Sequence, residues 1–399
     1  MAIPDSVRRE FEEALDAYVV KWRKGIAKHL RTLPSEALAN PPRKMAKAFN
    51  VNDHLLERAV HHHVGVQKYG AKIGADLQQT LENAEHDIRD AVNQYSDKNG
   101  KIKTRDLTAL IAAIYQIEQD YQGELDDQLR ADLEDFVDYE VAVAKTQLED
   151  ELPDDVTVND LDPDDVDSIL TDVAFQGRYI DDWVSDFSDA DYKRVRDAVQ
   201  AGVQSGSTAE TILAGLAGGA FLVGARQLEN VTRGIFNGVA NWARLLTYEA
   251  NPDLVSHVQW VAVLDADTCP ICSDLDGEIF ALDDVDPPPI HLSCRCSIVP
   301  VIVSFERLAR VSRLIHSHPK RHLFTGKPAT KLRYATWLRR QNKATHDEAL
   351  GPTRAKLFRE GGLTINRFVN HKGPDGKPHI LTLDELRKRD AAAFRRAGL

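Results

Sequence analysis

Residues 107–141 read LTALIAAIYQIEQDYQGELDDQLRADLEDFVDYEV, and apolar side chains recur in this stretch at steps of three and four residues. That is the period of one face of an α-helix. The pattern predicts one long amphipathic helix, which at about 1.5 Å per residue would span roughly 60 Å. Such a helix suits a protein that lies along a large assembly. The apolar positions are Leu107, Leu110, Ile111, Ile114, Ile117, Tyr121, Leu125, Leu129, Leu133, Phe136, Val137 and Val141.

The region before this stretch also has a helical pattern. We expect helices that break at the prolines of residues 33–35 and 40–42, and a turn at residues 96–100. Three consecutive histidines, His61 to His63, fall inside a predicted helix. There a partly exposed helix turn explains them better than a metal site. Residues 1–152 are therefore predicted to form a helical N-terminal region that contains the long acidic helix.

An acidic linker with Pro153 and Pro163 follows, and shorter elements come after it. The pairs Ser188 with Asp191 and Ser207 with Glu210 have the spacing of a capping box, which predicts two helix starts. A further helix is predicted from about residue 221 to residue 248, with Leu228, Val231, Ile235, Val239, Trp242 and Leu246 on one face.

Short runs rich in β-branched residues, at 259–264, 278–282 and 297–303, then predict a small sheet. The predicted fold is mainly α with a small α+β core: long amphipathic helices plus a short β-sheet that carries the cysteines. We expect a core domain at residues 153–303 and a basic tail region at residues 304–399.

The four cysteines of the chain are Cys269, Cys272, Cys294 and Cys296. A Cys-x2-Cys pair answered by Cys-x-Cys is typical of a tetrahedral metal site, and zinc is the metal we expect. His291 is a competing ligand, so a site of three cysteines and one histidine stays open, and the sequence does not choose. Four protein ligands would close the coordination shell and leave no position for water, which would make the metal structural. Disulfides are the alternative, and they are favoured if the protein works outside a cell.

The residues around the cysteines argue against an enzyme. A zinc deaminase needs an upstream His-x-Glu, which the chain lacks. A thioredoxin-like pair needs a following apolar helix, whereas Ser-Asp-Leu-Asp-Gly after Cys272 is typical of a turn. A metallohydrolase could use Asp265, Asp267, Asp274 and Asp276 with the histidine, but these carboxylates are equally explained as turn caps. No phosphate loop, nucleophile elbow or His-Glu-x-x-His is present. We predict no catalytic residues.

Charge is divided along the chain. The total is -12, but residues 301–399 carry 22 Lys and Arg against 8 Asp and Glu, so the preceding residues are strongly acidic. A basic end can hold nucleic acid, an acidic partner or the acidic region of a neighbouring copy. The candidates for contact with nucleic acid are Arg333, Arg339, Arg340 and Arg354, which an ordinary solvated helix face explains equally well.

No run of about 18 apolar residues and no secretory signal is evident, so we expect no membrane association. These features leave several functions open. The most specific evidence on function is a resemblance to a known family, in which a series of short motifs occurs in the same order.

The cysteine region resembles the core of the phage Mu F-like minor head proteins, the phage head morphogenesis family. The resemblance extends from about residue 165 to residue 390, and the chain departs from many members at Asp267, where they have arginine. The motifs are Trp260-Val-Ala-Val-Leu-Asp265, Thr268-Cys-Pro-Ile-Cys272, Leu275-Asp-Gly277, Phe280, Pro288-Pro289, His291, Cys294-Arg-Cys296 and Pro300, then Trp337-Leu-Arg-Arg-Gln341, Leu350-Gly-Pro-Thr-Arg354, Leu357-Phe-Arg-Glu-Gly361, Phe368 and Leu381-Thr-Leu-Asp-Glu-Leu386.

The resemblance implies a minor capsid protein, a low-copy structural component of a tailed phage, near the portal or neck or inside the head. It implies synthesis in the host cytoplasm and location in the virion, with several copies per particle. The implied partners are the portal protein and the major capsid or scaffold protein, together with packaged phage DNA for some relatives. Two alternatives remain: a metal- or thiol-dependent enzyme, and a toxin-delivery module built on the same core.

Overall fold

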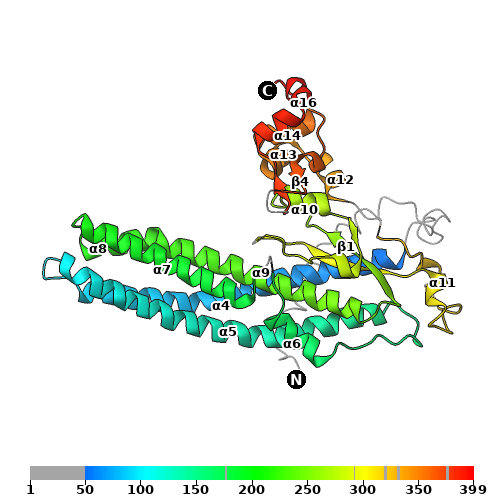
Figure 1. Cartoon of the computed structure of the whole chain (residues 1–399), viewed down its shortest axis with the longest axis horizontal. Helices are drawn as coiled ribbons and strands as arrows, with labels where there is room; N and C mark the ends of the chain where they lie inside the picture. The colour runs from blue at the N-terminus through cyan, green and yellow to red at the C-terminus, as the bar shows by residue number, and fades with distance from the viewer. Residues whose placement is uncertain (1–49, 176–177, 292, 319–320, 330–332, 374–376) are drawn as a thin grey trace, which may run out of the picture.

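The computed structural model describes residues 50–175, 178–291, 293–318, 321–329, 333–373 and 377–399. Figure 1 shows a long helical body, a small sheet at one end of it, and a C-terminal module that stands off to one side. The mainly α fold with a small sheet is therefore confirmed. The helix breaks expected at residues 33–35 and 40–42 lie outside the described residues.

The body is a bundle of four long helices: α4 (Val51–Gln94), α5 (Leu107–Glu149), α7 (Ile180–Gln204) and α9 (Ala220–Glu249). Two shorter helices, α6 (Pro163–Thr171) and α8 (Ala209–Gly218), pack against them, and the 3-10 turn η1 (Thr104–Asp106) precedes α5. The long helix expected from residue 107 is confirmed, and it continues to Glu149. Most of its predicted apolar stripe is buried, at Leu110, Ile114, Tyr121, Leu125, Leu129, Leu133, Phe136 and Val137.

Two predicted features of the bundle were wrong in detail. No helix begins near Ser188, because α7 already begins at Ile180, after a cap in which the Tyr179 amide donates to the Asp182 carboxylate. Its buried face runs on through this point, and the Ser188 hydroxyl donates to the Val184 carbonyl. The α8 cap is Thr208, one residue later than predicted, and its hydroxyl accepts from the Thr211 amide.

The histidine triplet lies on α4, as expected, but it is more buried than the partly exposed turn that the sequence suggested. His62 and His63 are both buried. The reason is tertiary: α4 passes between α5 and the sheet, so this turn of the helix has neighbours on both sides.

The sheet has three antiparallel strands in the order β2-β1-β3: β1 (Val255–Val261), β2 (Ile279–Phe280) and β3 (Ser297–Ile302). The short helix α10 (Pro270–Leu275) and the 3-10 turn η2 (Leu282–Asp284) lie between strands. Trp260 and the cysteines contribute to the hydrophobic cluster of this end, which also includes the ends of α4, α5 and α9.

Residues 334–399 form what we call the C-terminal module, with a hydrophobic cluster of its own that includes Tyr334, Leu338 and Phe368. The short elements α11 (Phe305–Leu308) and η3 (Arg321–Leu323) precede it. Its elements are α12 (Tyr334–Arg339), α13 (Lys343–Leu350), α14 (Pro352–Arg359), η4 (Ile365–Phe368), β4 (Val369–Asn370), β5 (His379–Ile380), α15 (Leu383–Arg389) and α16 (Ala391–Arg396).

The domain boundaries at residues 152 and 303 stay predictions. Helices from both sides of residue 152 share one hydrophobic cluster, in which Leu129 and Phe136 of α5 join Phe236 and Val239 of α9. The α+β region is therefore built directly onto the long helices.

One helical stretch, Ala209–Glu249, is long and apolar enough to cross a membrane by length and composition alone. The core helix of a soluble protein passes the same test. In this fold the second half of that stretch lies in the interior and carries the buried polar residues Asn237, Asn241 and Arg244.

Candidate metal centre

The first two cysteines sit at the start of α10. Cys269 is the N-cap residue, and its sulfur accepts from the Cys272 amide at 3.4 Å. Pro270 occupies the first helical position, where its missing amide costs nothing. The Ser273 hydroxyl donates to the Cys269 carbonyl at 2.7 Å. The sequence suggested a plain turn here; the structure has a six-residue helix, which points both sulfurs toward the same side.

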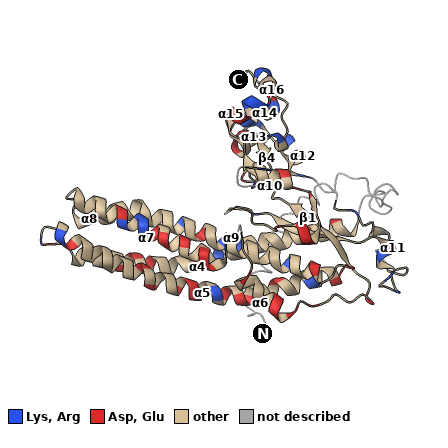
Figure 2. Cartoon of the chain, in the orientation of Figure 1, with Lys and Arg blue, Asp and Glu red and all other residues tan. Residues whose placement is uncertain are grey.

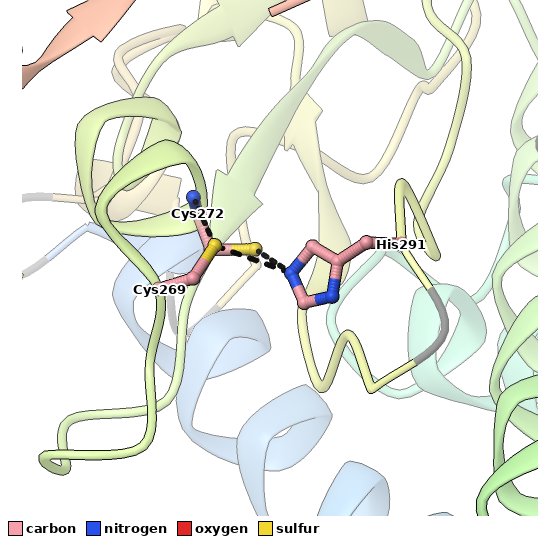
Figure 3. Close-up of side chains that lie close together, drawn as sticks. All are labelled: Cys269, Cys272 and His291. Carbon is pink, nitrogen blue, oxygen red and sulfur yellow. Dashed lines mark hydrogen bonds between the residues drawn. The ribbon is translucent and has the colours of Figure 1, made fainter. Parts of the chain in front are cut away.

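His291 meets this pair. Its Nε2 lies 3.2 Å from the Cys269 Sγ and 3.1 Å from the Cys272 Sγ (Figure 3). The Cys272 Sγ lies 3.7 Å from the Cys294 Sγ. Two groups of donor atoms result, each with all atoms within 4.8 Å of one another: Cys269, Cys272 and His291, and Cys272, Cys294 and Cys296. Cys272 belongs to both groups, so all five predicted donors converge around one thiol.

The spacing of these donors fits a tetrahedral ion better than a disulfide. Zn–S bonds of about 2.3 Å place two sulfurs about 3.8 Å apart at tetrahedral angles, and a sulfur and an imidazole nitrogen about 3.6 Å apart. The Cys272–Cys294 distance of 3.7 Å matches this edge. A disulfide needs about 2.05 Å, and all four cysteines are free thiols. Each group of three donors can hold a metal ion. A site of four ligands would join members of both groups, which do not all lie within 4.8 Å of one another, so it requires a movement of about 1 Å, as estimated from those bond lengths.

The thiols differ in acidity. A hydrogen bond from the Cys272 thiol, assisted by His291, lowers the pKa of Cys269 to about 5. Burial opposes ionisation of Cys294, but hydrogen bonds with Cys272 and Cys296 hold its pKa well below the usual value. Burial raises the pKa of Cys296 well above it. Hydrogen bonds with Cys269 and its other neighbours raise the pKa of Cys272 above the usual value as well. A metal that binds the thiolates of this cluster would displace the protons that the thiols share.

Helix α9 holds the second cysteine segment by its backbone. The Asn237 Nδ2 donates to the Cys294 carbonyl at 2.8 Å, and the Asn241 Nδ2 donates to the Cys296 carbonyl at 3.2 Å. The Asn241 Oδ1 accepts from the Ile298 amide at 3.0 Å. These buried bonds hold the backbone of the segment that carries Cys294 and Cys296 against α9. Sequence reasoning missed both asparagines, although their spacing of four residues on an apolar helix was a usable signal.

A buried ionic network stands behind these bonds. Arg244 and Glu140 are 1% and 0% exposed, and their side chains lie 3.3 Å apart. His62 Nε2 contacts the other Glu140 oxygen at 2.6 Å, and Arg244 donates to the Ser297 hydroxyl at 2.5 Å. Burial opposes ionisation of Glu140, but His62 and Arg244 together hold its pKa below the usual value. The network thus ties α4, α5 and α9 to the first residue of β3.

The neighbouring histidine of α4 supports the cysteine loop directly. The His63 Nε2 donates to the Arg295 carbonyl at 2.8 Å, and burial lowers the pKa of His63 to about 3. His63 is therefore neutral at physiological pH. His62 and His63 therefore support the site from outside the ligand set.

The aspartates around the cysteines act as caps and ion-pair partners. Asp265 pairs with both terminal nitrogens of Arg295 at 2.6 and 2.7 Å, and it accepts from the Asp267 amide. Asp276 accepts from the amides of Ala262 and Tyr334. Within the described residues, neither group of possible metal ligands includes a carboxylate. This arrangement offers no support for a metallohydrolase.

The four arginines predicted to contact nucleic acid have different surroundings. Arg339 and Arg340 are exposed at the end of α12. Arg333 lies 3.8 Å from the Glu278 carboxylate. Arg354 is partly buried and donates to the Leu381 carbonyl at 2.9 Å, so it helps to hold the module together. The nucleic-acid site stays a prediction, and Arg339 and Arg340 are the two whose exposure suits it.

A cavity of about 960 Å³ lies between α4 and the sheet, close to this site. Its walls are mainly aliphatic, with Leu56 and Val60 on one side and Val261 and Val299 on the other. Arg333 lines it as well. The cavity borders β1 and β3, and none of the five candidate ligand residues lines it.

Fold and site together define a mainly helical protein whose small sheet carries a Cys/His centre of metal-binding type. Residues 193–299 match the family model described as Phage Mu protein F like protein. The matched segment runs from α7 to β3, so it contains α9 and all five donors, and it confirms the predicted resemblance there. This domain indicates phage head morphogenesis, which is a structural function. No curated protein and no solved structure matches the chain significantly.

Proposed function

We propose that this protein is a minor capsid protein of a tailed phage, a low-copy structural component of the virion near the portal or neck or inside the head. The single observation that carries the proposal is the family match, because the matched residues coincide with the cysteine centre and the helix that supports it. The partners are the portal protein and the major capsid or scaffold protein. Synthesis takes place in the host cytoplasm.

The metal has a structural role in this proposal. Cys269, Cys272, His291 and Cys294 hold zinc, and Cys296 supports them from the buried side. Four protein ligands leave no position for a reacting water, which is the arrangement of structural zinc sites. The shared position of Cys272, 3.1 Å from the His291 Nε2 and 3.7 Å from the Cys294 Sγ, supports this set.

The charge distribution of this protein supports contact between its C-terminal module and DNA. Figure 2 marks many acidic residues along the helices of the bundle, with basic residues among them, and several basic residues on the C-terminal module. In the module, Arg339, Arg340, Arg387, Lys388 and Arg389 are exposed. Packaged DNA is the polyanion that such a surface would meet inside a head.

The proposal is tested by quantitative mass spectrometry of purified particles, with this chain counted against the portal protein. A few to about a dozen copies, the scale of a closed ring, is the expected result. Absence from mature particles, with presence in assembly intermediates, would overturn the virion assignment.

DNA contact is tested separately with the purified full-length chain. The double variant Arg339→Glu/Arg340→Glu should weaken binding to duplex DNA and reduce the slope of log affinity against log salt, because each lost phosphate contact lowers that slope by about 0.9. Arg105→Glu, exposed beside the first turn of α5, is the matched control. Equal effects of the two changes would argue against a DNA-binding surface on the module.

A further inference from the structure

The C-terminal module is attached to the body mainly through one short helix. Within the described residues, α12, η4, β4 and β5 all pack against α10. Figure 1 shows the module above α10, with the bundle on the far side of the sheet. The helix that starts with Cys269 and Cys272 is therefore also the platform on which the module rests.

Tyr334, the first residue of α12, makes the central contacts. Its hydroxyl donates to the Asp265 carbonyl at 3.0 Å, and its amide donates to Asp276 Oδ2 at 2.7 Å. The other oxygen of Asp276 accepts from the Ala262 amide at 2.8 Å. Because Tyr334 is fully buried, these bonds are shielded from water. They join the module to the loops that enter and leave α10.

A second attachment lies on α10 itself. His371, which directly follows β4, places its Nε2 2.9 Å from the Asp274 carboxylate. The Asp274 side chain is 13% exposed and the His371 side chain 57% exposed, so the pair lies at the edge of the interface. Asp274 follows Cys272 by two residues. Any movement of the cysteine helix therefore moves the partner of His371.

The C-terminal end of α10 is tied to β1 by backbone bonds, in which the Gly277 amide donates to the Trp260 carbonyl and the Trp260 amide donates to the Glu278 carbonyl. A six-residue helix is not stable alone, since a helix of that length has barely passed nucleation. Its first turn is attached to the body by the cluster of sulfur atoms, where Cys269 and Cys272 meet His291 and Cys294. A metal ion bound there would fix the helix, through coordination bonds, to the segment that precedes β3 and to the loop that carries His291.

We propose that metal binding at Cys269, Cys272, His291 and Cys294 locks α10 in place and thereby sets the position of the C-terminal module on the body. The centre is a metal-dependent joint between two charged parts. It rests on the structural zinc site proposed above. Residues 334–399 carry 14 Lys and Arg against 7 Asp and Glu, so the joint positions a net-positive module relative to an acidic bundle.

The test is hydrogen exchange followed by mass spectrometry on the full-length chain, with zinc bound and after removal of zinc by a chelator. Peptides covering residues 262–278 and 333–340 should exchange about tenfold faster without zinc, the change expected when one hydrogen bond is lost. Peptides from α15 and α16 should not change, because the module keeps its own core. Small-angle scattering should show a larger radius of gyration. Zinc should restore both readouts.

Two variants separate the joint from the metal site. Tyr334→Phe removes the hydroxyl but keeps the buried ring, and Asp274→Asn removes the ion pair with His371. Both should bind one zinc per chain and still release the module, with faster exchange at residues 333–340. Asp347→Asn, which removes the ion pairs of Asp347 with Lys343 and Arg359 inside the module, is the matched control that should leave the interface protected.

Each outcome decides a different proposal. One bound zinc per chain with exchange at residues 333–340 unchanged on chelation would overturn the joint and leave the structural zinc site standing. Absence of bound zinc from protein purified with reduced thiols would overturn both. Neither result bears on the virion assignment, which the particle count tests independently.

Discussion

The two halves of helix α9 hold the molecule together in different ways. The N-terminal half presents Leu228, Val231 and Ile235 to the bundle, where they interdigitate with apolar side chains of the other long helices. The C-terminal half also contributes apolar side chains to that core, at Phe236 and Val239. It differs in presenting Asn237, Asn241 and Arg244, which bond to the backbone of the cysteine segment and to the first side chain of β3. One helix thus contributes to two kinds of contact. The first is an apolar core that the hydrophobic effect stabilises, and the second is a set of polar contacts with the cysteine segment and β3, which we call the polar seam.

The apolar core and the polar seam should differ in how well they tolerate amino-acid substitutions. An apolar core accepts side chains of similar volume, because dispersion and the hydrophobic effect are not directional. A buried polar seam accepts few changes, since each donor or acceptor left without its partner costs its desolvation energy. The bundle should therefore respond to lost volume, whereas the cysteine end should respond to lost donors, acceptors and metal ligands.

Cys272→Ser should have the largest effect, because Cys272 belongs to both groups of possible ligands. Zinc content, measured by inductively coupled plasma mass spectrometry, should fall from one per chain to near zero, and the sheet should lose protection while bundle helicity remains. Cys296→Ser is the matched control and should keep the zinc. Loss of zinc in both variants would instead favour four cysteine ligands.

Phe236→Ala should come next and should act on the bundle alone. Phe236 is fully buried, with ring centroids 5.4 Å from Tyr69 and 4.8 Å from Phe136. Its truncation should lower the free energy of unfolding by about 3–5 kcal/mol. Chemical denaturation measures this, and zinc content should not change. A fall in zinc content would show that the two ends of α9 are not independent.

Stability should also fall as the pH rises, through buried Glu118 of α5. Burial raises its pKa to about 8, and nearby Asp191 adds to the shift. The folded state then keeps a proton that the unfolded state releases above about pH 4.5. The contribution is full below that pH and is lost as the pH approaches 8, by about 1.4 kcal/mol per pH unit at most.

Glu118→Gln tests this sign. The amide cannot ionise, so the melting temperature of the variant should depend less on pH between 5.5 and 8 than that of the wild type. A wild-type melting temperature that rises over this range in parallel with the variant would contradict the assignment. Glu118 packs with Tyr121 and Arg194 in the half of the bundle that lies away from the cysteines. Zinc content should therefore be the same in Glu118→Gln and in the wild type.

Asn241→Ala should have the smallest effect of the four on the free energy of unfolding, about 1–3 kcal/mol, the cost of unsatisfied buried groups. It removes the donor to the Cys296 carbonyl and the acceptor for the Ile298 amide. Zinc affinity, measured by competition with a chelating dye, should weaken as well. Asn230→Ala, on the same helix but only partly buried, is the control. Equal affinities in both variants would separate the seam from the metal site.

The sequence predicted the helices best, because helical periodicity is a local property. The apolar steps of residues 107–141 and the face from Leu228 to Leu246 both correspond to observed helices. It was wrong at Ser188, where a local capping pattern lost to a buried face that continues through it. Short-range signals fail where distant residues decide what is buried.

The candidate site was predicted as a list of donors but not as an arrangement. Residue type and spacing alone predict soft metal ligands at Cys-x2-Cys, His291 and Cys-x-Cys. Their convergence depends on Asn237, which is 57 residues from Cys294, and on His63, which is 232 residues from Arg295. Tyr334 reaches Asp265 across 69 residues. No spacing rule links residues so far apart.

Residue type and local period alone therefore account for the long helices, for the five candidate ligand residues and for the opposite net charges of the bundle and the C-terminal module. Only the tertiary structure decided that α9 would turn polar toward β3, that Cys272 would stand between two groups of donors, and that the cysteine helix would carry the C-terminal module. The physical reason is that burial and hydrogen-bond satisfaction are set by neighbours brought together in space, after the chain has folded.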